Sequence, residues 1–249
     1  MKNKIVIKNI KSKFYHKLIN NEAIYDKNSI NRYKKKTGNN EKSLNKNKFE
    51  NLQSLKNKIN SIKNCELKKS ATNLVFSDGN PDAKIMIIGE GPGANEDKEG
   101  KPFVGRAGKL LDKMLESIKL NRKNVYISNV VNFRPPMNRK PTDEEIQRYL
   151  PFLIKHIELI NPKILLLLGT PALKTVLKER RPISKVRGTW YQMPVNYMDE
   201  SLCVMPLFHP AYLLRYSNNK IGSPKWLMKQ DMQRVKAALH DMSLSAVID

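Results

Sequence analysis

Residues 89–106 form the segment of this chain that is richest in chemically useful side chains. The segment follows a short apolar run and precedes an amphipathic helical pattern, and it reads Gly-Glu-Gly-Pro-Gly-Ala-Asn-Glu-Asp-Lys-Glu-Gly-Lys-Pro-Phe-Val-Gly-Arg. Strand, glycine-rich loop and helix together let a backbone close around a small flat ligand. Three carboxylates, on Glu90, Glu96 and Asp97, would repel a phosphate. The loop therefore favours acid–base chemistry over phosphate binding.

The elements that must position this loop alternate along the chain. The predicted strands are Lys84–Ile88, Val125–Val131, Ile164–Leu168 and Cys203–Phe208. The predicted helices are Gly108–Lys119, Thr142–Ile160, Pro171–Leu177 and Pro224–Met242. Strands that are apolar on both faces are typical of a parallel sheet covered by helices. We therefore expect a three-layer α/β/α domain around a central, mostly parallel, four-stranded sheet.

The remaining polar clusters follow the later strands. Residues 129–139 lie in and after the second strand, Gly169 follows the third, and His209 follows the fourth. Open parallel sheets bind ligands at the carboxyl ends of their strands. Four separate segments are thus predicted to meet at one edge of the sheet.

Three motifs resemble those of the family 4 uracil-DNA glycosylases. They are residues 89–108, residues 129–139 (Asn-Val-Val-Asn-Phe-Arg-Pro-Pro-Met-Asn-Arg) and residues 209–215 (His-Pro-Ala-Tyr-Leu-Leu-Arg). Shorter matches lie between them in the same order, and the resemblance spans roughly residues 65–242. It implies the uracil-DNA glycosylase fold and an enzyme of base excision repair. Such an enzyme flips uracil out of DNA and hydrolyses its N-glycosidic bond.

The resemblance also implies catalytic roles for Glu96, Asn138 and His209. Cleavage leaves a uracil anion and an electron-poor sugar, so hydrogen-bond donors are needed on the base and an anion near the sugar. We expect His209 to donate to uracil O2, and Glu96 to hold or deprotonate the attacking water that Asn138 positions. The alternatives are a structural histidine at a turn, and a solvated acidic loop or helix cap for Glu96.

Four residues are predicted to bind the base: Glu90, Gly91, Phe103 and Asn129. Phe103 offers a face for a flipped base. The amide of Asn129 can donate to uracil O4 and accept from N3–H, whereas cytosine presents the opposite pattern. Glu90 is a second candidate for the carboxylate that activates water. A buried aromatic that fills the loop, and a structural Asn in a strand, are the alternatives for Phe103 and Asn129.

Five residues are predicted to contact DNA. Arg134, Arg139 and Arg215 are candidate phosphate contacts, although each alone is also compatible with a plain surface charge. Leu213 and Leu214 resemble the loop that wedges into the duplex when the base leaves. Both leucines are equally compatible with a place in the core.

The chain departs from the family where the iron–sulfur cluster is held by four cysteines. The matching positions are Cys65, Lys68, Phe133 and Tyr149, and Cys203 matches none of them. Lys, Phe and Tyr cannot replace thiolate ligands. We therefore predict no cluster, no other metal and no cofactor, with the two aromatic rings filling the vacated volume.

Charge and composition divide the chain. Its formal net charge is +23 over 249 residues, and residues 1–64 hold 17 Lys/Arg against 4 Asp/Glu. We expect a basic, Lys/Asn-rich and partly disordered extension at 1–64, although the spacing from Phe49 to Ile62 predicts a helix that packs on the body. The catalytic domain is predicted at 65–249. The alternative explanation of this Lys- and Asn-rich composition is an AT-rich genome.

These features define the expected setting of the protein. The chain has two cysteines, no secretory signal and no long apolar run, which predicts a protein without membrane association, in a bacterial-type cytoplasm and acting at the nucleoid. The oligomeric state is left open by the sequence, with a monomer as the default. DNA that contains uracil is the expected partner, together with a replication or repair protein. The alternative function is a catalytically silent relative that binds uracil or abasic DNA. A nucleotide hydrolase fits poorly because no phosphate-binding Lys-Ser/Thr pair follows the glycines.

Overall fold

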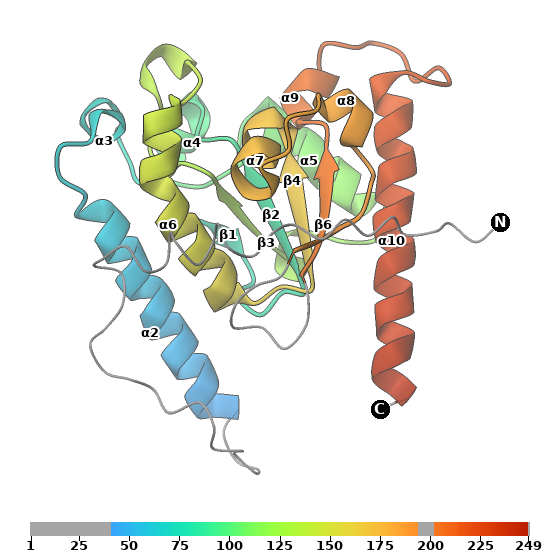
Figure 1. Ribbon diagram of the computed structural model, residues 1–249, viewed down its shortest axis with the longest axis horizontal. Helices are drawn as coiled ribbons and strands as arrows, with labels where there is room; N and C mark the ends of the chain where they lie inside the picture. The colour runs from blue at the N-terminus through green and yellow to red at the C-terminus, as the bar shows by residue number, and fades with distance from the viewer. Residues whose placement is uncertain (1–40, 194–201, 249) are drawn as a thin grey trace.

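The computed structural model describes residues 41–193 and 202–248, and Figure 1 shows how their elements are arranged. The strands are β1 Asp78–Gly79, β2 Ile85–Gly89, β3 Val125–Asn129, β4 Ile164–Leu168, β5 Tyr191–Met193 and β6 Leu202–Leu207. They form one sheet in the order β1-β3-β2-β4-β6-β5. The inner four are parallel, as expected, and they match the four predicted strands to within one or two residues at each end.

The prediction of a four-stranded sheet is wrong at the edges. Strands β1 and β5 add one antiparallel strand to each side, so the sheet has six strands. These strands are two and three residues long. Asp-Gly and Tyr-Gln-Met are too short to show the alternation of apolar and polar residues by which a strand is recognised.

Helices cover both faces of the sheet and complete the three layers. The helices are α2 Glu41–Asn60, α3 Glu66–Ser70, α4 Ala94–Glu99, α5 Arg106–Glu116, α6 Asp143–Ile160, α7 Gly169–Leu177, α8 Ile183–Val186, α9 Pro210–Leu213 and α10 Pro224–Ile248. Short 3₁₀ turns lie at η1 Arg122–Asn124 and η2 Pro136–Asn138. Figure 1 shows α6 in front of the sheet and α5 behind it.

The core is divided by the sheet because successive side chains of a strand point to opposite faces. Met86 and Ile88 of β2 pack with residues of α2, α6 and α7. Ile85 and Ile87 of the same strand pack with residues of α5, α9 and α10. All five residues of β2, β3 and β4 are buried, as the apolar runs of β2 and β4 predict, and in β3 the burial includes the polar residues Ser128 and Asn129.

Helix α6 starts where the sequence predicts it. The Thr142 hydroxyl accepts from the Glu145 backbone N–H, and the Glu145 carboxylate accepts from the Thr142 N–H at 2.8 Å. This reciprocal pair is a capping box and satisfies two of the free N–H groups at the helix start.

Helix α2 packs on the body, as its spacing predicts. Leu52, Leu55 and Ile59 are buried in the same cluster as α6, whereas Phe49 is 68% exposed. The residues before Glu41 lie outside the described part of the chain. The boundary at residue 64 therefore stays a prediction. Because α2 contributes to the core, a deletion that tests the extension should remove only the residues before Glu41.

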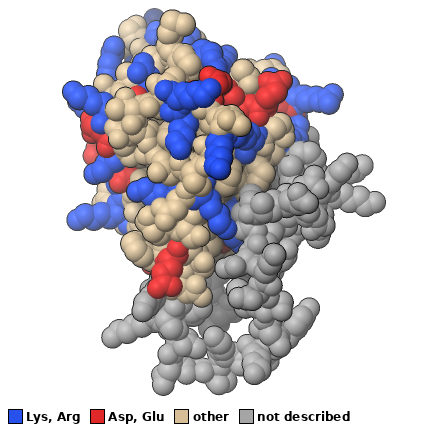
Figure 2. Space-filling view, turned by 90° about the vertical axis from the view of Figure 1, so that its left-hand side faces the viewer, with Lys and Arg blue, Asp and Glu red and all other residues tan. Residues whose placement is uncertain are grey.

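The outer face of α2 and α3 is strongly basic. Figure 2, which views the molecule from this side, shows many Lys and Arg side chains with few Asp or Glu among them. Within the described residues, the helices are all too short or too polar to cross a lipid bilayer.

Candidate active site

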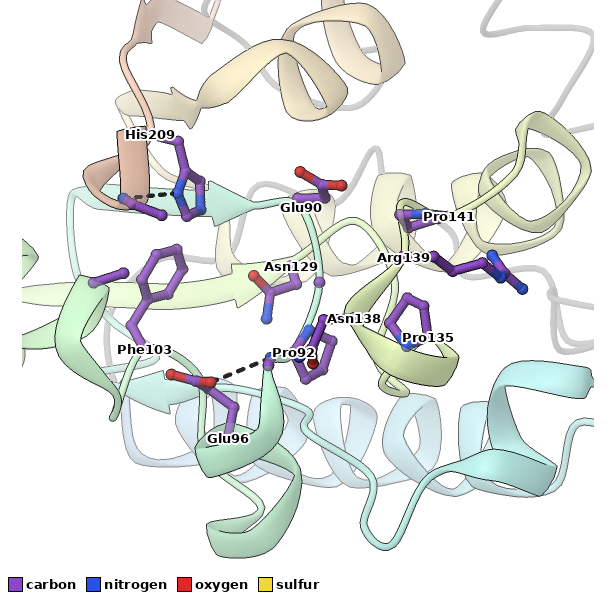
Figure 3. Close-up of a pocket in the computed structure, with 14 residues that line it drawn as sticks. Glu90, Pro92, Glu96, Phe103, Asn129, Pro135, Asn138, Arg139, Pro141 and His209 are labelled. Atoms are coloured by element: carbon purple, nitrogen blue, oxygen red, sulfur yellow. Dashed lines mark hydrogen bonds between the residues drawn. The ribbon is translucent and has the colours of Figure 1, made fainter. Parts of the chain in front are cut away.

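A cavity of about 280 Å³ lies at the carboxyl ends of β2 and β3. Figure 3 shows its walls, which come from the loop after β2, from the end of β3, from the η2 turn and from the start of α9. It is lined by Glu90, Gly91, Pro92, Gly93, Glu96, Phe103, Ala107, Asn129, Pro135, Asn138, Arg139, Pro141, His209 and Ala211. All seven residues predicted to act in catalysis or base binding are in this set. The structure thus brings together the three motifs that the sequence separates.

Asn129 is the last residue of β3 and lies at the centre of the cavity (Figure 3). Its side chain is 3% exposed, and its Oδ1 has no hydrogen-bond partner among the described residues. A buried carbonyl oxygen without a partner is costly unless a ligand supplies a donor. The cavity therefore has a fixed acceptor that is ready for an N–H group.

Gly89 allows this placement of Asn129. The two residues are paired in the β2–β3 register. A Cβ at position 89 would lie 2.4 Å from Asn129 Oδ1 and 2.5 Å from Phe103 Cζ. Both distances are impossible contacts, so the absence of a side chain at Gly89 creates the space between the amide and the ring.

Phe103 and His209 face each other across the cavity (Figure 3). Their ring centroids are 5.7 Å apart at an interplanar angle of 30°. His209 Nδ1 accepts from the Ala211 backbone N–H at 3.1 Å, so a neutral imidazole carries its proton on Nε2. Burial lowers the pKa of His209 to about 4, although the carboxylate of Glu96 acts in the opposite direction. At neutral pH the ring is an uncharged donor.

The two carboxylates of the cavity differ in their partners. Glu96 accepts from Gly93 N at 3.2 Å with Oε2, and from Val104 N at 3.0 Å and Gly105 N at 2.8 Å with Oε1. Through these contacts Glu96 caps the start of α4 and ties Gly93 to Val104 and Gly105. This is the helix-cap role that was the alternative to catalysis for Glu96. The carboxylate of Glu90 has no hydrogen-bond partner among the described residues, and burial raises its pKa against the lowering effect of Lys140.

Asn138 is held in place by a short network. Arg134 Nε donates to Asn138 Oδ1 at 2.8 Å, and Arg134 Nη1 lies 4.0 Å from Asp97 Oδ2. Asp97 is buried and accepts from the backbone N–H groups of Thr72 and Asn73. Asn138 itself has a left-handed backbone with φ of 57°, a conformation that asparagine tolerates better than most residues.

The residues predicted to contact DNA are distributed differently. Arg139 lines the cavity, but its guanidinium points away from the centre and pairs with Glu145 at 2.6 and 2.8 Å (Figure 3). Leu214 and Arg215 are exposed just beyond α9. Leu213 is only 1% exposed and packs in the core with α5 and α10, so its assignment to DNA is corrected. It is a core leucine because α9 lies flat on the body.

Sequence reasoning missed the apolar walls of the cavity. Pro92, Pro135 and Pro141 complete the lining, and they stand inside or beside the motifs already recognised. Clustered prolines next to polar motifs were an available signal. The buried position of Asp97 had no such signal, because an acidic residue in a glycine-rich loop is more often exposed.

Comparisons with known proteins agree with this geometry. Residues 76–236 match the model of the uracil DNA glycosylase superfamily, which defines the class of the fold and of the site. The type-4 uracil-DNA glycosylase of Thermotoga maritima is 42% identical over 174 residues, which cover 70% of this chain and 86% of that protein. The type-4 enzyme of Sulfurisphaera tokodaii is 40% identical over 193 residues, covering 76% and 84%. The chain therefore belongs to the type-4 uracil-DNA glycosylase family.

The four positions that the sequence resemblance relates to cysteine ligands do not hold residues that fit an iron–sulfur cluster. Cys65 and Tyr149 are buried, and Cys65 Sγ lies 3.4 Å from Tyr149 Oη. Phe133 is buried in the same core cluster, and Lys68 Nζ donates to the Asn60 carbonyl. One thiol among four positions cannot replace four thiolates. No group of three or more His, Cys, Asp or Glu suited to a metal occurs within residues 41–193 and 202–248.

Proposed function

We propose that this protein is a monofunctional uracil-DNA glycosylase, which accepts a flipped uracil in the cavity and hydrolyses its bond to deoxyribose. The observation that carries the proposal is the buried Oδ1 of Asn129 in the cavity, which accepts no hydrogen bond from any residue that the structure describes. The printed names of its relatives as type-4 uracil-DNA glycosylases support the same activity.

Asn129 accounts for selection of the base. Uracil N3–H supplies the donor that Oδ1 lacks, and uracil O4 accepts from the amide N–H of the same side chain. Cytosine presents an acceptor at N3 and an amino group at C4, so both contacts would be lost. A site that loses paired contacts in this way rejects the wrong substrate strongly. Phe103 supplies the apolar face on which the base stacks.

His209 accounts for stabilisation of the leaving group. When the N-glycosidic bond breaks, the electron pair stays on uracil and negative charge develops on O2. The neutral Nε2–H of His209 donates to that oxygen without a proton transfer, because the pKa near 4 keeps the ring uncharged at neutral pH. A fixed donor at a developing oxyanion is worth about 2.7–4 kcal/mol in the transition state.

Glu90 is the better placed of the two carboxylates to hold the attacking water. Both oxygens of Glu96 are engaged by backbone N–H groups, so Glu96 maintains the loop and adds negative charge near the sugar. Glu90 is free to accept from water, and Asn138 holds the same water with its amide. Water adds to the sugar C1′ as the bond to uracil breaks, one of its protons passes to the carboxylate, and the uracil anion leaves an abasic site in the DNA. No lysine is among the described residues that line the cavity, so no Schiff-base step is proposed.

DNA is proposed to contact the rim of the cavity through Leu214 and Arg215. Leu214 has an exposed apolar side chain 38% accessible to solvent, which suits insertion between bases. Arg139 becomes a phosphate contact only if it leaves Glu145. Arg134 is occupied by Asn138 and is assigned to the network that positions this amide.

No iron–sulfur cluster is part of the proposed enzyme. The contacts of Cys65, Phe133 and Tyr149 support apolar packing in the place of a cluster. Iron and sulfide analysis of the purified protein, with its absorption near 400 nm, tests this point. Stoichiometric iron would contradict it.

The activity is tested with a labelled oligonucleotide that contains one uracil, incubated in EDTA and then treated with hot alkali. We expect scission at the uracil, none in matched oligonucleotides with thymine or cytosine, and none before the alkali step. Tight binding without scission would instead support the silent relative that recognises uracil or abasic DNA. Scission without alkali would contradict the monofunctional assignment.

A further inference from the structure

The backbone of Phe103 is in an unusual conformation. Its φ is 55°, in the left-handed region, and its side chain is 6% exposed. A bulky aromatic residue rarely adopts this conformation, because its Cβ approaches its own carbonyl oxygen. Such a residue persists only where its surroundings hold it. The surroundings of Phe103 therefore decide where its ring stands in the cavity.

Arg122 of η1 holds this turn from outside the cavity. Its Nη1 donates to the carbonyl of Pro102 at 3.1 Å, and its Nη2 donates to the carbonyl of Phe103. Arg122 is not among the residues that line the cavity, so it cannot touch the base. Its contact with the site passes through the backbone of Phe103.

Two carboxylates fix the guanidinium itself. Arg122 Nη1 lies 2.6 Å from Asp78 Oδ2, and its Nε lies 2.9 Å from Asp112 Oδ1. The side chains of Arg122, Asp78 and Asp112 are 26%, 27% and 36% exposed. Asp78 belongs to the edge strand β1 and Asp112 to α5. A guanidinium held by both carboxylates presents its remaining N–H groups in one orientation.

Gly108 closes the turn from the other side. A Cβ at this position would lie 1.7 Å from the Phe103 carbonyl oxygen, so α5 approaches the turn as closely as the backbone allows. The carbonyl is thus confined between α5 and Arg122. With the carbonyl fixed, the Phe103 ring is directed towards His209 (Figure 3).

We propose that Arg122 is a positioning residue, which holds the Phe103 ring at the height where a flipped base stacks. The proposal rests on the proposed function, because it assigns the ring to stacking. It also explains why Asp78 and Asp112, which are remote from the base, belong to the working site.

A double-mutant cycle between Arg122 and Phe103 tests the proposal, with single-turnover uracil release as the measurement. Stacking of a base on an aromatic ring is worth about 1–3 kcal/mol, so Phe103→Ala should lower kcat/KM by roughly 5-fold to 150-fold. Arg122→Gln should lower it by about 10-fold in the native background, and by less than about 2-fold when Phe103 is already alanine.

The control variant is Arg148→Gln. Arg148 also donates to two consecutive carbonyls, those of Lys63 and Asn64, but it lies away from the cavity. It should change the melting temperature as Arg122→Gln does and leave kcat/KM unchanged. If Arg122→Gln does not fold, the double-mutant cycle is repeated with Arg122→Lys. This variant keeps the positive charge and loses the paired N–H donors of the guanidinium.

The outcomes distinguish the positioning role of Arg122 from the stacking role of Phe103. Equal losses from Arg122→Gln in both backgrounds would overturn the positioning role, because a general structural effect is additive. An unchanged kcat/KM in Phe103→Ala would instead overturn the stacking role of the ring in the proposed function. Free uracil as a product inhibitor gives an independent measure, since its inhibition constant should rise in both single variants.

Discussion

The cavity and the region of Cys65, Phe133 and Tyr149, which the resemblance relates to cluster ligands, differ in character. Asn129 and Asn138 line the cavity, and Phe133 lies between them in the chain. Within the described part of the chain, the buried Asn129 Oδ1 of the cavity has no hydrogen-bond partner, and Phe103 and Asn138 have left-handed backbone. At the other region, Tyr149 and Cys65 are in contact and the aromatic rings are buried. From this difference we expect the cavity to serve the proposed chemistry and the other region to serve stability.

Substitution of His209 should give the largest loss of activity. His209→Ala removes the donor to uracil O2, and we expect kcat to fall by a factor of about 10²–10³ with little change in melting temperature. Single-turnover rates on the uracil oligonucleotide and thermal denaturation measure both effects. A loss of activity below 10-fold would contradict the proposed role of His209 in the chemistry of the cavity.

Substitution of Tyr149 should have the reverse profile. Tyr149→Ala leaves a void where a ring is 1% exposed, and the free energy of unfolding should fall by about 3–5 kcal/mol. The rate per folded molecule should stay within about 3-fold of the native value. Tyr149→Phe is the matched control, because it removes only the contact with Cys65 and should cost about 1 kcal/mol. A rate loss as large as that of His209→Ala would show that the two regions are not separable.

The pH dependence of activity sharpens the assignment of Glu90. Because burial raises the pKa of this carboxylate above its usual 4.5, its ionised form is present only at higher pH. Activity should therefore rise with pH through that raised value and be lost as pH falls through it. His209, with a pKa of about 4, is neutral throughout this range.

Glu90→Gln should remove this loss of activity at low pH. Glu96→Gln should keep the loss and destabilise the loop that Glu96 caps. Rates measured between about pH 5 and pH 8, where His209 stays neutral, distinguish the variants. A loss of activity at low pH that survives in Glu90→Gln would transfer the role to another group.

The basic extension should have the smallest effect. Residues 1–40 hold 11 Lys/Arg against 2 Asp/Glu, and their removal leaves α2 and its core leucines intact. If they add non-specific DNA affinity through counterion release, the slope of log K against log salt should become shallower by about 1 or more. Uracil release at saturating DNA should not change. An unchanged slope would refute the role.

The sequence predicts the framework because the framework depends on long local patterns. Four apolar strands and a capping box specify the parallel sheet and α6, and the motifs at the strand ends meet in one cavity. Strands β1 and β5 escape prediction because hydrogen bonds to their neighbours define them, whereas their residue types do not. Arg122 and the contact of Arg134 with Asn138 escape prediction for a related reason. Their partners are an amide and backbone carbonyls, which are brought near only by the fold.

Gly89 shows that discrimination in this protein depends on an empty place as much as on a side chain. One methyl group there would push Asn129 and Phe103 apart and fill the slot that the edge of a pyrimidine must enter. We therefore expect Gly89→Ala to weaken the proposed recognition of the base, although every reactive group remains in the chain.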